Sequence, residues 1–309
     1  LVTGGSGFIG TNFVKYLLED QEALEVSVQS EIRVVNLDLL TYAAGGRNIE
    51  YLKLSSHPNY KLIHGSIGDK ALVDKVLEEE KPDVIFNFAA ESHVDRSILD
   101  SESFRKTNLE GTGVLLDSAI KHGKIKFIQI STDEVYGSLS LNSPSSKETD
   151  AKHPRSAYSA TKSGAEDLTL AAFETNKLPI IITRSSNNYG IFQFPEKILP
   201  LFLTNLIDGK KVPLMWSEEN PGLNVRDWLH VKDNCRAIWF ISQKGKIGEI
   251  YNISGDNEKT NIELTKTLLS SFGKGEEMIE KIPHRLGHDF RYSIDSSKLK
   301  SLGFFYKNK

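Results

Sequence analysis

Three glycines spaced three residues apart open the chain, in the segment Gly4-Gly5-Ser6-Gly7-Phe8-Ile9-Gly10. The segment follows an apolar run over residues 1–3, which we expect to end a strand, and precedes an expected helix over residues 11–19. Glycines at these positions permit a tight turn, let the backbone approach a pyrophosphate group, and allow the helix to pack closely on the strand. A purely structural turn is the alternative, but the placement between strand and helix predicts a dinucleotide-binding turn.

Strand and helix patterns alternate through the next part of the chain. Apolar, β-prone runs predict strands at residues 32–38, 60–64, 84–89, 126–130 and 180–184. Helical spacing of apolar residues predicts helices at residues 70–79, 104–121 and 157–173. This alternation predicts an α/β fold with a Rossmann-type doubly wound parallel sheet.

The regular alternation stops after residue 184, which predicts two domains. We expect a Rossmann domain over residues 1–185 and a smaller, mixed α/β domain over residues 186–309. Within the second part we predict a helix at 198–207 and a strand at 225–231, and we expect segments near 224–242 and 284–295 to return to the first domain.

An acidic residue ends the second predicted strand. Asp38 stands where a carboxylate can accept hydrogen bonds from the ribose of adenosine and repel a 2′-phosphate. The sequence therefore favours NAD over NADP. The distance from Gly10 to Asp38 exceeds the usual spacing of about 20 residues, and we interpret residues 21–31 as a longer connection between helix and strand.

A pair of adjacent acids follows the strand predicted at residues 126–130. Thr132, Asp133 and Glu134 lie where ligands bind on such sheets, beyond the carboxyl end of a strand. Neighbouring residues in a regular strand face opposite sides, so both acids can reach one substrate only if the chain bends just past the strand. Without a bend the pair is a solvated turn.

Tyr158 and Lys162 lie four residues apart in the helix predicted at 157–173, and therefore on one helix face. A fixed ammonium group beside a phenol stabilises the phenolate and lowers a pKa that is normally about 10. An ordinary surface pair is the alternative, but the acid pair and the glycine turn favour a catalytic base. We interpret His93, which follows the strand at 84–89, as a structural histidine rather than a base.

The composition excludes several classes of function. The 309-residue chain has a net charge of −3 and no basic tract, so we expect no nucleic-acid partner. Cys235 is the only cysteine, which excludes an internal disulfide and a cysteine-based metal site, and we expect no metal. No apolar run approaches the roughly 18 residues needed to span a membrane, so the cytoplasm is the expected location. Because the chain starts at Leu1, we expect both ends to be incomplete.

Scattered cationic residues occur in the C-terminal part, at Lys197, Arg226, Arg285 and His288. Each of them alone is consistent with a solvated surface. Together, opposite a cofactor-binding domain, they suit a diphosphate group, because guanidinium and ammonium groups are the side chains that bind phosphate oxygens most strongly.

These motifs together resemble the extended short-chain dehydrogenase/reductase superfamily, and within it the dTDP-glucose 4,6-dehydratases. The resemblance runs nearly end to end and rests on residues 4–10, 89–97, 131–137, 158 with 162, 186–190, 194–197, 226–228 and 285–289. The Thr-Asp-Glu sequence at 132–134 is far more specific to sugar-nucleotide dehydratases than the Tyr/Lys pair. The chain departs from the family pattern at Ser66, at Leu286 and in the longer loop over residues 215–222.

The resemblance implies NAD-dependent removal of water from a nucleotide-activated glucose, most specifically dTDP-glucose, by a lyase. Tyr158 would take the 4-hydroxyl proton while hydride passes from C4 to NAD⁺. Lys162 would hold the tyrosine and bind the nicotinamide ribose, and Thr132 would bond the C4 oxygen. Glu134 would then remove the C5 proton, and Asp133 would protonate the leaving 6-hydroxyl before hydride returns to C6.

The resemblance also implies two sets of binding residues and a homodimer formed through helices of the cofactor domain. The residues implied to bind NAD are Gly4, Gly7, Phe8, Ile9, Gly10, Asp38, Leu39, Leu40, Thr41, Ser66, Ile67, Phe88, Ala89, Ala90, Ser92, Thr107, Tyr158, Lys162 and Asn188. Those implied to bind the nucleotide sugar are Ser92, Thr132, Asn187, Lys197, Ile198, Arg226, Asn252, Arg285 and His288.

Two other functions use the same fold. A sugar-nucleotide 4-epimerase or decarboxylase would use the same tyrosine, lysine and NAD, but epimerisation at C4 needs no acid at C6. A non-catalytic NAD-binding regulator would have no use for the intact Tyr158/Lys162 pair.

Overall fold

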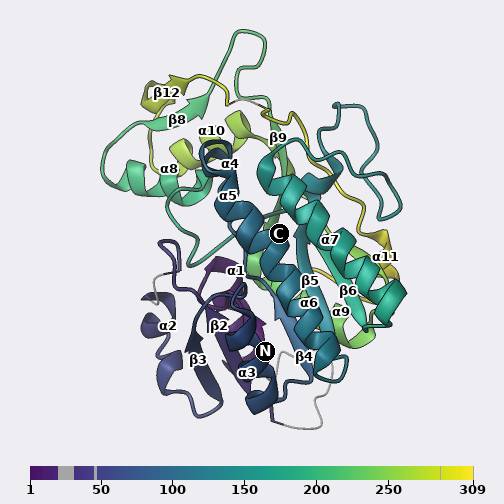
Figure 1. The fold of residues 1–309 in the computed structure, drawn as a ribbon. Helices are drawn as coiled ribbons and strands as arrows, with labels where there is room; N and C mark the ends of the chain where they lie inside the picture. Colours follow the sequence, from purple (N-terminus) through teal and green to yellow (C-terminus); the bar gives the residue numbers. More distant parts are fainter. Residues whose placement is uncertain (20–30, 45–46, 286, 309) are drawn as a thin grey trace.

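The glycine turn joins an inner strand of a large parallel sheet to a helix (Figure 1). In the computed structural model, which describes residues 1–19, 31–44, 47–285 and 287–308, β1 (Val2–Thr3) lies between β2 (Val34–Asp38) and β4 (Val84–Asn87). Within these residues the sheet has seven strands in the order β10-β6-β5-β4-β1-β2-β3, all parallel. The other members are β3 (Tyr60–His64), β5 (Lys126–Thr132), β6 (Ile180–Ser185) and β10 (Ile250–Ile253). The predicted Rossmann-type α/β fold is confirmed.

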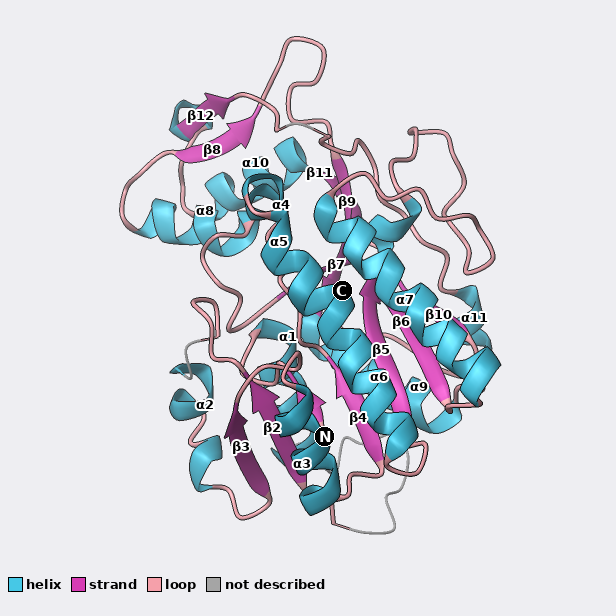
Figure 2. Cartoon of the chain, viewed as in Figure 1, coloured by secondary structure: helices cyan, strands magenta, loops and turns pink. Residues whose placement is uncertain are grey.

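Helices cover both faces of this sheet. On one face lie α1 (Phe8–Glu19) and α9 (Val231–Lys244), and on the other α3 (Lys70–Glu80), α6 (Thr112–Lys121) and α7 (Ala157–Asn176), drawn in front of the strands in Figure 2. In β6 the side chain of Ile181 joins the first core, whereas Ile180 and Ile182 join the second. Successive strand residues point to opposite faces, so a strand covered on both sides is apolar throughout.

The C-terminal part builds two small sheets beside the carboxyl ends of the large one. One sheet contains β7 (Asn187–Tyr189), β9 (Val225–His230) and β11 (Glu258–Thr260); the other pairs β8 (Val212–Met215) with β12 (Ile279–Ile282). Helices α8 (Ile198–Ile207) and α10 (Asn261–Ser271) pack on β8 around Phe202 and Leu269. The remaining elements are α2 (Arg47–Tyr51), η2 (Leu54–Ser56), α4 (Val94–Leu99), α5 (Ser101–Phe104), η3 (Arg105–Gly111), η4 (Asp133–Tyr136), η5 (Glu276–Met278) and α11 (Ser297–Ser301).

Most predicted elements have nearly the predicted bounds, and the strand at 60–64 and the helix at 198–207 match theirs. The helix predicted at 104–121 is interrupted, because η3 is a π-helical stretch that precedes α6. Most of the connection expected at residues 21–31, and the departure at Leu286, lie outside the described residues. No helix in the part of the chain that the structure describes is long and apolar enough to cross a membrane.

The C-terminal half contributes more to the large sheet than the sequence indicated. Of the segment near 224–242, α9 covers the sheet, whereas β9 belongs to a small sheet. The segment at 284–295 runs beside the 138–146 loop, and its Ile294 packs on Val135 and Tyr136. In addition β10, which we had assigned to the second domain, pairs with β6 as an edge strand. Contacts distant in sequence, which periodicity cannot show, decide this placement.

Candidate active site

The turn after β1 needs glycine at two positions for steric reasons. Gly4 has φ +68°, and a Cβ atom there would lie 2.7 Å from the backbone of Ala89. A Cβ on Gly10 would collide with the carbonyl oxygen of Gly4, which accepts a hydrogen bond from Gly7 N at 3.2 Å. The turn therefore brings bare backbone to the N-terminus of α1, where the helix dipole favours an anion such as pyrophosphate.

A cavity of about 240 Å³ lies against this turn, beyond the carboxyl ends of the central strands. Seventeen of the predicted NAD-binding residues line it: Gly4, Gly7, Phe8, Ile9, Gly10, Asp38, Leu39, Thr41, Ser66, Ile67, Phe88, Ala89, Ala90, Ser92, Thr107, Tyr158 and Lys162. Leu40 and Asn188 were predicted but do not line the cavity, whereas Lys197, predicted to bind the sugar nucleotide, does. The shape and the donor set of this cavity fit a dinucleotide.

The carboxylate of Asp38 is fixed at the cavity by two backbone amides. Ser6 N donates to its Oδ2 at 2.8 Å, and Leu40 N donates to its Oδ1 at 2.7 Å. Leu40 has φ +52°, so its amide turns back to the strand end while its side chain leaves the cavity. Burial raises the pKa of Asp38, and these hydrogen bonds oppose the rise. Each oxygen keeps a lone pair for a ribose hydroxyl.

We expect the protein to bind NAD⁺ more tightly than NADP⁺, by roughly 10- to 100-fold, because Asp38 would lie beside the 2′-phosphate and juxtaposed like charges cost several kcal/mol. Asp38→Asn should narrow this difference, whereas Asp117→Asn, on the exposed surface of α6, should not. Titration followed by intrinsic fluorescence would measure both constants. Tighter binding of NADP⁺ by the parent protein would refute the role given to Asp38.

The acid pair lies on a bend that begins where β5 ends. Thr132 is extended, and the chain then turns into the 3₁₀ helix η4. The Thr132 hydroxyl accepts a hydrogen bond from Glu134 N at 3.3 Å and donates to Asp133 Oδ1 at 3.2 Å. The alternation of side chains along β5 stops at this cap. The chain therefore bends just past the strand, as it must if both acids are to face one substrate.

The two acids have different electrostatic surroundings. Burial raises the pKa of Asp133 well above its usual range, and the charges of Glu134 and Asp227 raise it further. Its Oδ2 is buried and has no hydrogen-bond partner among the described residues. Burial also raises the pKa of Glu134, but Arg285 and Arg226 oppose this rise. Asp133 is therefore suited to donate a proton, and Glu134 to accept one.

Tyr158 and Lys162 lie on one face of α7, as predicted, but the predicted pKa shift of Tyr158 is wrong. Burial and the negative charge of Glu134 raise the pKa of Tyr158, and a hydrogen bond with Thr132 offsets only part of the rise. Lys162 is itself buried and donates to the carbonyl of Ile130 at 2.5 Å. Burial lowers the pKa of Lys162 to about 8, with Glu166 opposing the shift. Desolvation, which a spacing of four residues does not reveal, is the largest cause of the pKa shift in both residues.

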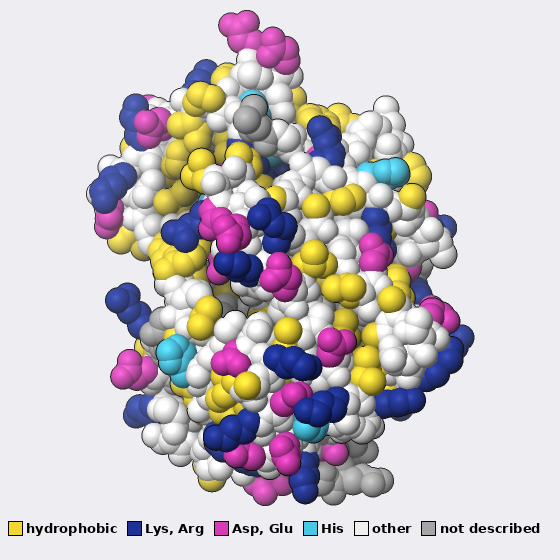
Figure 3. All heavy atoms as spheres, viewed as in Figure 1, with side chains coloured by type: hydrophobic (Ala, Val, Ile, Leu, Met, Phe, Trp, Pro, Cys, Tyr) yellow, Lys and Arg dark blue, Asp and Glu magenta, His cyan; other side chains and the backbone are white. Residues whose placement is uncertain are grey.

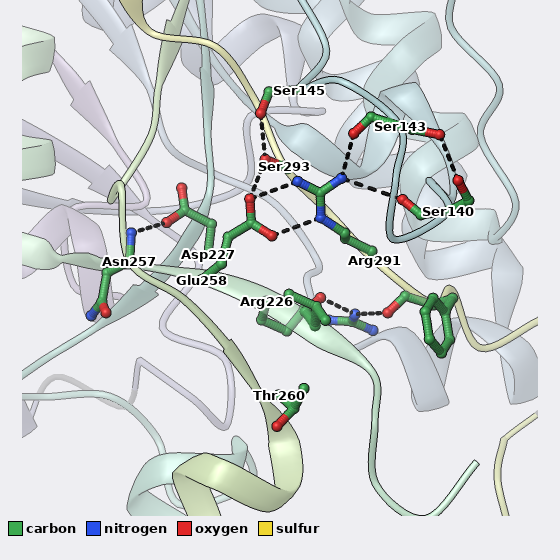
Figure 4. Close-up of polar contacts among 12 residues, drawn as sticks. Ser140, Ser143, Ser145, Arg226, Asp227, Asn257, Glu258, Thr260, Arg291 and Ser293 are labelled. Atoms are coloured by element: carbon green, nitrogen blue, oxygen red, sulfur yellow. Dashed lines mark hydrogen bonds and ion pairs between the residues drawn. The ribbon is translucent and has the colours of Figure 1, made fainter.

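Arg226 and Arg291, which come from neighbouring segments, differ in what they bind (Figure 4). Arg291 pairs with both oxygens of Glu258 at 2.7 Å. Arg226 instead donates to the backbone carbonyls of Val225 at 2.7 Å and Asp289 at 3.0 Å, and stacks on the ring of Tyr292. Bonds to neutral acceptors orient the guanidinium of Arg226 without cancelling its charge, so it remains suited to a phosphate.

Two further predicted cations lie close to Glu134, as their electrostatic effects on it show. Lys197 donates to the carbonyl of Ser92 at 2.9 Å and lies just before Ile198, the first residue of α8. Arg285 approaches Asp95 at 3.4 Å, while its Nε is buried and has no hydrogen-bond partner among the described residues. Of the two, only Lys197 is among the residues that line the cavity.

Three other predicted substrate residues have different outcomes. The prediction that His288 is cationic is wrong, because burial and the charges of Arg226 and Arg285 lower its pKa to about 3. Asn252 is fully buried in β10, where its side chain bonds Tyr136 and two backbone carbonyls, so its role as a ligand stays a prediction. Asn187, in contrast, has a buried Oδ1 with no partner among the described residues, as a ligand-binding amide would.

Gln193, Phe194 and Glu196 line the cavity, although no role was predicted for them. The carboxylate of Glu196 accepts a hydrogen bond from the hydroxyl of Tyr42 at 3.0 Å, which connects the segment before α8 to the loop after β2. The sequence did contain a signal, since residues 194–197 form part of the family motif. His93 N-caps α4 by accepting from Arg96 N at 3.4 Å, in agreement with the structural role predicted for it.

Comparisons with known proteins agree with this geometry. A family model described as GDP-mannose 4,6 dehydratase matches residues 1–307. The low-salt glycan biosynthesis protein Agl12 of Haloferax volcanii is 46% identical over 305 residues, covering 98% of this chain and 92% of its own. The dTDP-glucose 4,6-dehydratase of Streptomyces niveus is 44% identical over 305 residues, with 98% and 87% covered.

Among solved structures, the fold is similar to that of DesIV, a dTDP-glucose 4,6-dehydratase from Streptomyces venezuelae, in a crystal structure with NAD bound. The TM-score is 0.92 at 42% identity, and the match covers 100% of this chain and 92% of DesIV. The resemblance seen in the motifs thus extends over the whole fold. The chain belongs to the GDP-mannose 4,6-dehydratase family of extended short-chain dehydrogenases/reductases, as a member similar to the dTDP-glucose 4,6-dehydratases.

Proposed function

We propose that this protein is an NAD-dependent sugar-nucleotide 4,6-dehydratase that converts dTDP-glucose to dTDP-4-keto-6-deoxyglucose. The observation that carries the proposal is the bend at η4, which presents a buried acid and a second carboxylate beside Tyr158. The names of the relatives from Streptomyces niveus and Streptomyces venezuelae support the choice of dTDP-glucose.

The first step is oxidation at C4 of the sugar. Tyr158 accepts the proton of the 4-hydroxyl, and Thr132, which hydrogen-bonds Tyr158, lies where it can also bond the C4 oxygen. Lys162, which donates to the carbonyl of Ile130, lines the cavity and would bind the nicotinamide ribose. NAD⁺, bound in the cavity, supplies the hydride acceptor at C4, the source of hydride for C6, and a positive charge that favours the phenolate.

The second step is loss of water across C5 and C6. The 4-ketone acidifies the C5 proton, which Glu134 removes as a base. Asp133, kept protonated by burial and by the neighbouring carboxylates, gives its proton to the departing 6-hydroxyl, which leaves as water. Hydride then returns to C6 while Glu134 gives its proton back to C5, which completes the product. The proton that Tyr158 took from the 4-hydroxyl balances the proton that Asp133 gave to the departing water.

Incubation with dTDP-glucose is the direct test of the activity. We expect a 4-keto-6-deoxy product, identified by mass and by its ketone, without net consumption of NAD⁺. A sugar changed only in its C4 configuration would establish the epimerase alternative. Binding of NAD⁺ with no chemistry on the sugar would establish the regulator alternative.

The proposal includes a homodimer formed through the helices beside the cavity. Ile98 and Leu99 of α4 and Leu168 of α7 are exposed, and α4 packs on α7. Apolar residues grouped on adjacent helices are typical of an interface. Leu168→Glu should convert the dimer to a monomer in sedimentation equilibrium, whereas Leu302→Glu, at a similarly exposed leucine, should not. A parent protein that sediments as a monomer would remove this part of the proposal.

We further propose a cytoplasmic enzyme whose partners are the cofactor and the nucleotide sugar, with no nucleic acid or membrane. On the face drawn in Figure 3, cationic and acidic side chains are interspersed. This mixture gives no single-sign surface of the kind that binds nucleic acid. The nucleotide-sugar chemistry and the use of NAD support the location.

A further inference from the structure

A chain of buried polar residues lies behind the turn that carries the acid pair. It begins at Tyr136, the last residue of η4, whose hydroxyl donates to Asn252 Oδ1 at 2.9 Å and accepts from Arg184 Nη1 at 2.7 Å. The guanidinium of Arg184 also lies over the Tyr136 ring, 4.7 Å from its centroid. The side chain of Tyr136 is therefore fixed at its hydroxyl and at its ring.

Arg184 is held in turn by an acid on the catalytic helix. Its Nε and Nη2 donate to the two oxygens of Glu166 at 3.0 and 2.7 Å, and both side chains are almost completely buried. Glu166 lies one helical turn after Lys162 on α7, and its charge raises the pKa of that lysine. The carboxylate of Glu166 thus binds Arg184, which holds Tyr136. It also acts electrostatically on Lys162, the lysine of the oxidation step.

Asn252 completes the chain from the edge strand β10. Its amide nitrogen donates to the carbonyls of Ser146 at 3.0 Å and Asp295 at 3.2 Å, while its oxygen receives the Tyr136 hydroxyl. Tyr136, Glu166, Arg184 and Asn252 are all absent from the cavity lining. Their side chains are hydrogen-bonded to one another, so they act on the reaction through the groups that they hold.

Because η4 is a 3₁₀ helix, the position of the Tyr136 side chain influences the directions in which Asp133 and Glu134 point. Such a helix has three residues per turn, so side chains at positions i and i+3 project from the same side. Tyr136 is three residues after Asp133, and Glu134 is one third of a turn away. The turn is also fixed at its end, because His153 N donates to the carbonyl of Val135 at 2.9 Å. Holding the Tyr136 side chain therefore sets the rotation of the whole turn.

We propose that Tyr136, held by the Glu166–Arg184 pair and by Asn252, is a positioning residue for water elimination: it aligns Asp133 and Glu134 with the sugar that Tyr158 oxidises. This inference rests on the proposed function. The two steps of the reaction should respond differently. Loss of the contacts that hold Tyr136 should disturb the turn that carries Asp133 and Glu134, and so slow water elimination, while α7 and the oxidation step stay intact.

The test is Tyr136→Phe, which keeps the ring and removes the hydroxyl shared by Arg184 and Asn252. Formation of NADH on mixing with dTDP-glucose should stay near the parent rate, since Tyr158 and Lys162 lie on α7 and Thr132 is the last residue of β5. Turnover to the 4-keto-6-deoxy product should fall roughly 100-fold, the loss typical of a misplacement of about 1 Å. NADH and the 4-keto-glucose nucleotide should therefore accumulate. Backbone amides of residues 133–137 should exchange with deuterium faster than in the parent.

Tyr251→Phe is the matched control. Tyr251 precedes Asn252 in β10, is equally buried, and accepts a hydrogen bond from Lys246 N at 2.9 Å on the other face of the sheet. Any loss of stability should resemble that of Tyr136→Phe, but NADH should not accumulate. The inference is overturned if Tyr136→Phe dehydrates at the parent rate, if both variants lose oxidation and dehydration equally, or if exchange at 133–137 is unchanged. Deuterium exchange needs no substrate, so it tests the hold of Tyr136 on residues 133–137 separately from the proposed activity.

Discussion

Glu134→Gln is expected to stop the reaction after C4 oxidation. Tyr158 and Lys162 are untouched, so NADH and a 4-keto-glucose nucleotide should build up. Loss of the base should slow water elimination by about 10²–10⁴-fold, the usual contribution of a positioned acid or base. Hydrogen at C5 should also fail to exchange with solvent deuterium. Absorbance of NADH and mass analysis of the sugar would follow the two steps separately.

Asp133→Asn provides the contrast to this result. It keeps the base, so exchange at C5 should persist, while departure of the 6-hydroxyl slows without its acid. If both variants dehydrate dTDP-glucose at the parent rate, the acid pair is only a solvated turn and the epimerase interpretation returns.

The pH dependence of turnover should report Glu134. Burial raises the pKa of this carboxyl above its ordinary value of 4.5. Because the base must be ionised, turnover should fall as the pH drops through that raised pKa, at a higher pH than an exposed glutamate would give. In Glu134→Gln this acid limb should disappear from the residual rate of elimination.

Arg226→Lys is expected to raise the KM for dTDP-glucose by about 10- to 100-fold with little change in kcat. The lysine keeps the positive charge but loses the planar fork that binds two phosphate oxygens at once. Hydrogen bonds to charged groups contribute about 1.5–3 kcal/mol, which corresponds to this range of affinity. Initial-rate kinetics on dTDP-glucose would separate KM from kcat.

Arg291→Lys is the control for this experiment. Arg291 lies on the same side of the fold, but its guanidinium is saturated by Glu258 and by the carbonyls of Ser140 and Ser143. Its replacement should lower the melting temperature and leave KM unchanged. A KM that rises equally in both variants, or in neither, would place the diphosphate away from Arg226.

Local signals in the sequence predicted the parts of the site that depend on local chemistry. The glycine turn and Asp38 line the cavity as expected, because a turn and a strand end are determined by neighbouring residues. The motif that contains Thr132 indicated that a bend was required, and the cap made by its hydroxyl supplies that bend.

The differences from prediction arise where burial or distant contacts decide the outcome. The sequence alone suggests that His288 can carry a positive charge, but burial and two neighbouring arginines lower its pKa and keep the ring neutral. Asn252 has the side chain of a ligand, yet β10 places it inside the sheet, where Tyr136 bonds it. The pKa of Tyr158 depends on desolvation, which a spacing of four residues does not encode.

The late position of β10 and α9 in the chain has a consequence for biosynthesis. When synthesis has passed residue 185, the glycine turn, the acid pair and the tyrosine have all been made. One face of the sheet, around Phe86 and Ile181, still lacks the cover that Ile238 and Trp239 of α9 provide. The free edge of β6 also waits for β10. A nascent chain therefore exposes an apolar surface and an unpaired strand edge until its last quarter emerges, and in that interval a chaperone has most to protect.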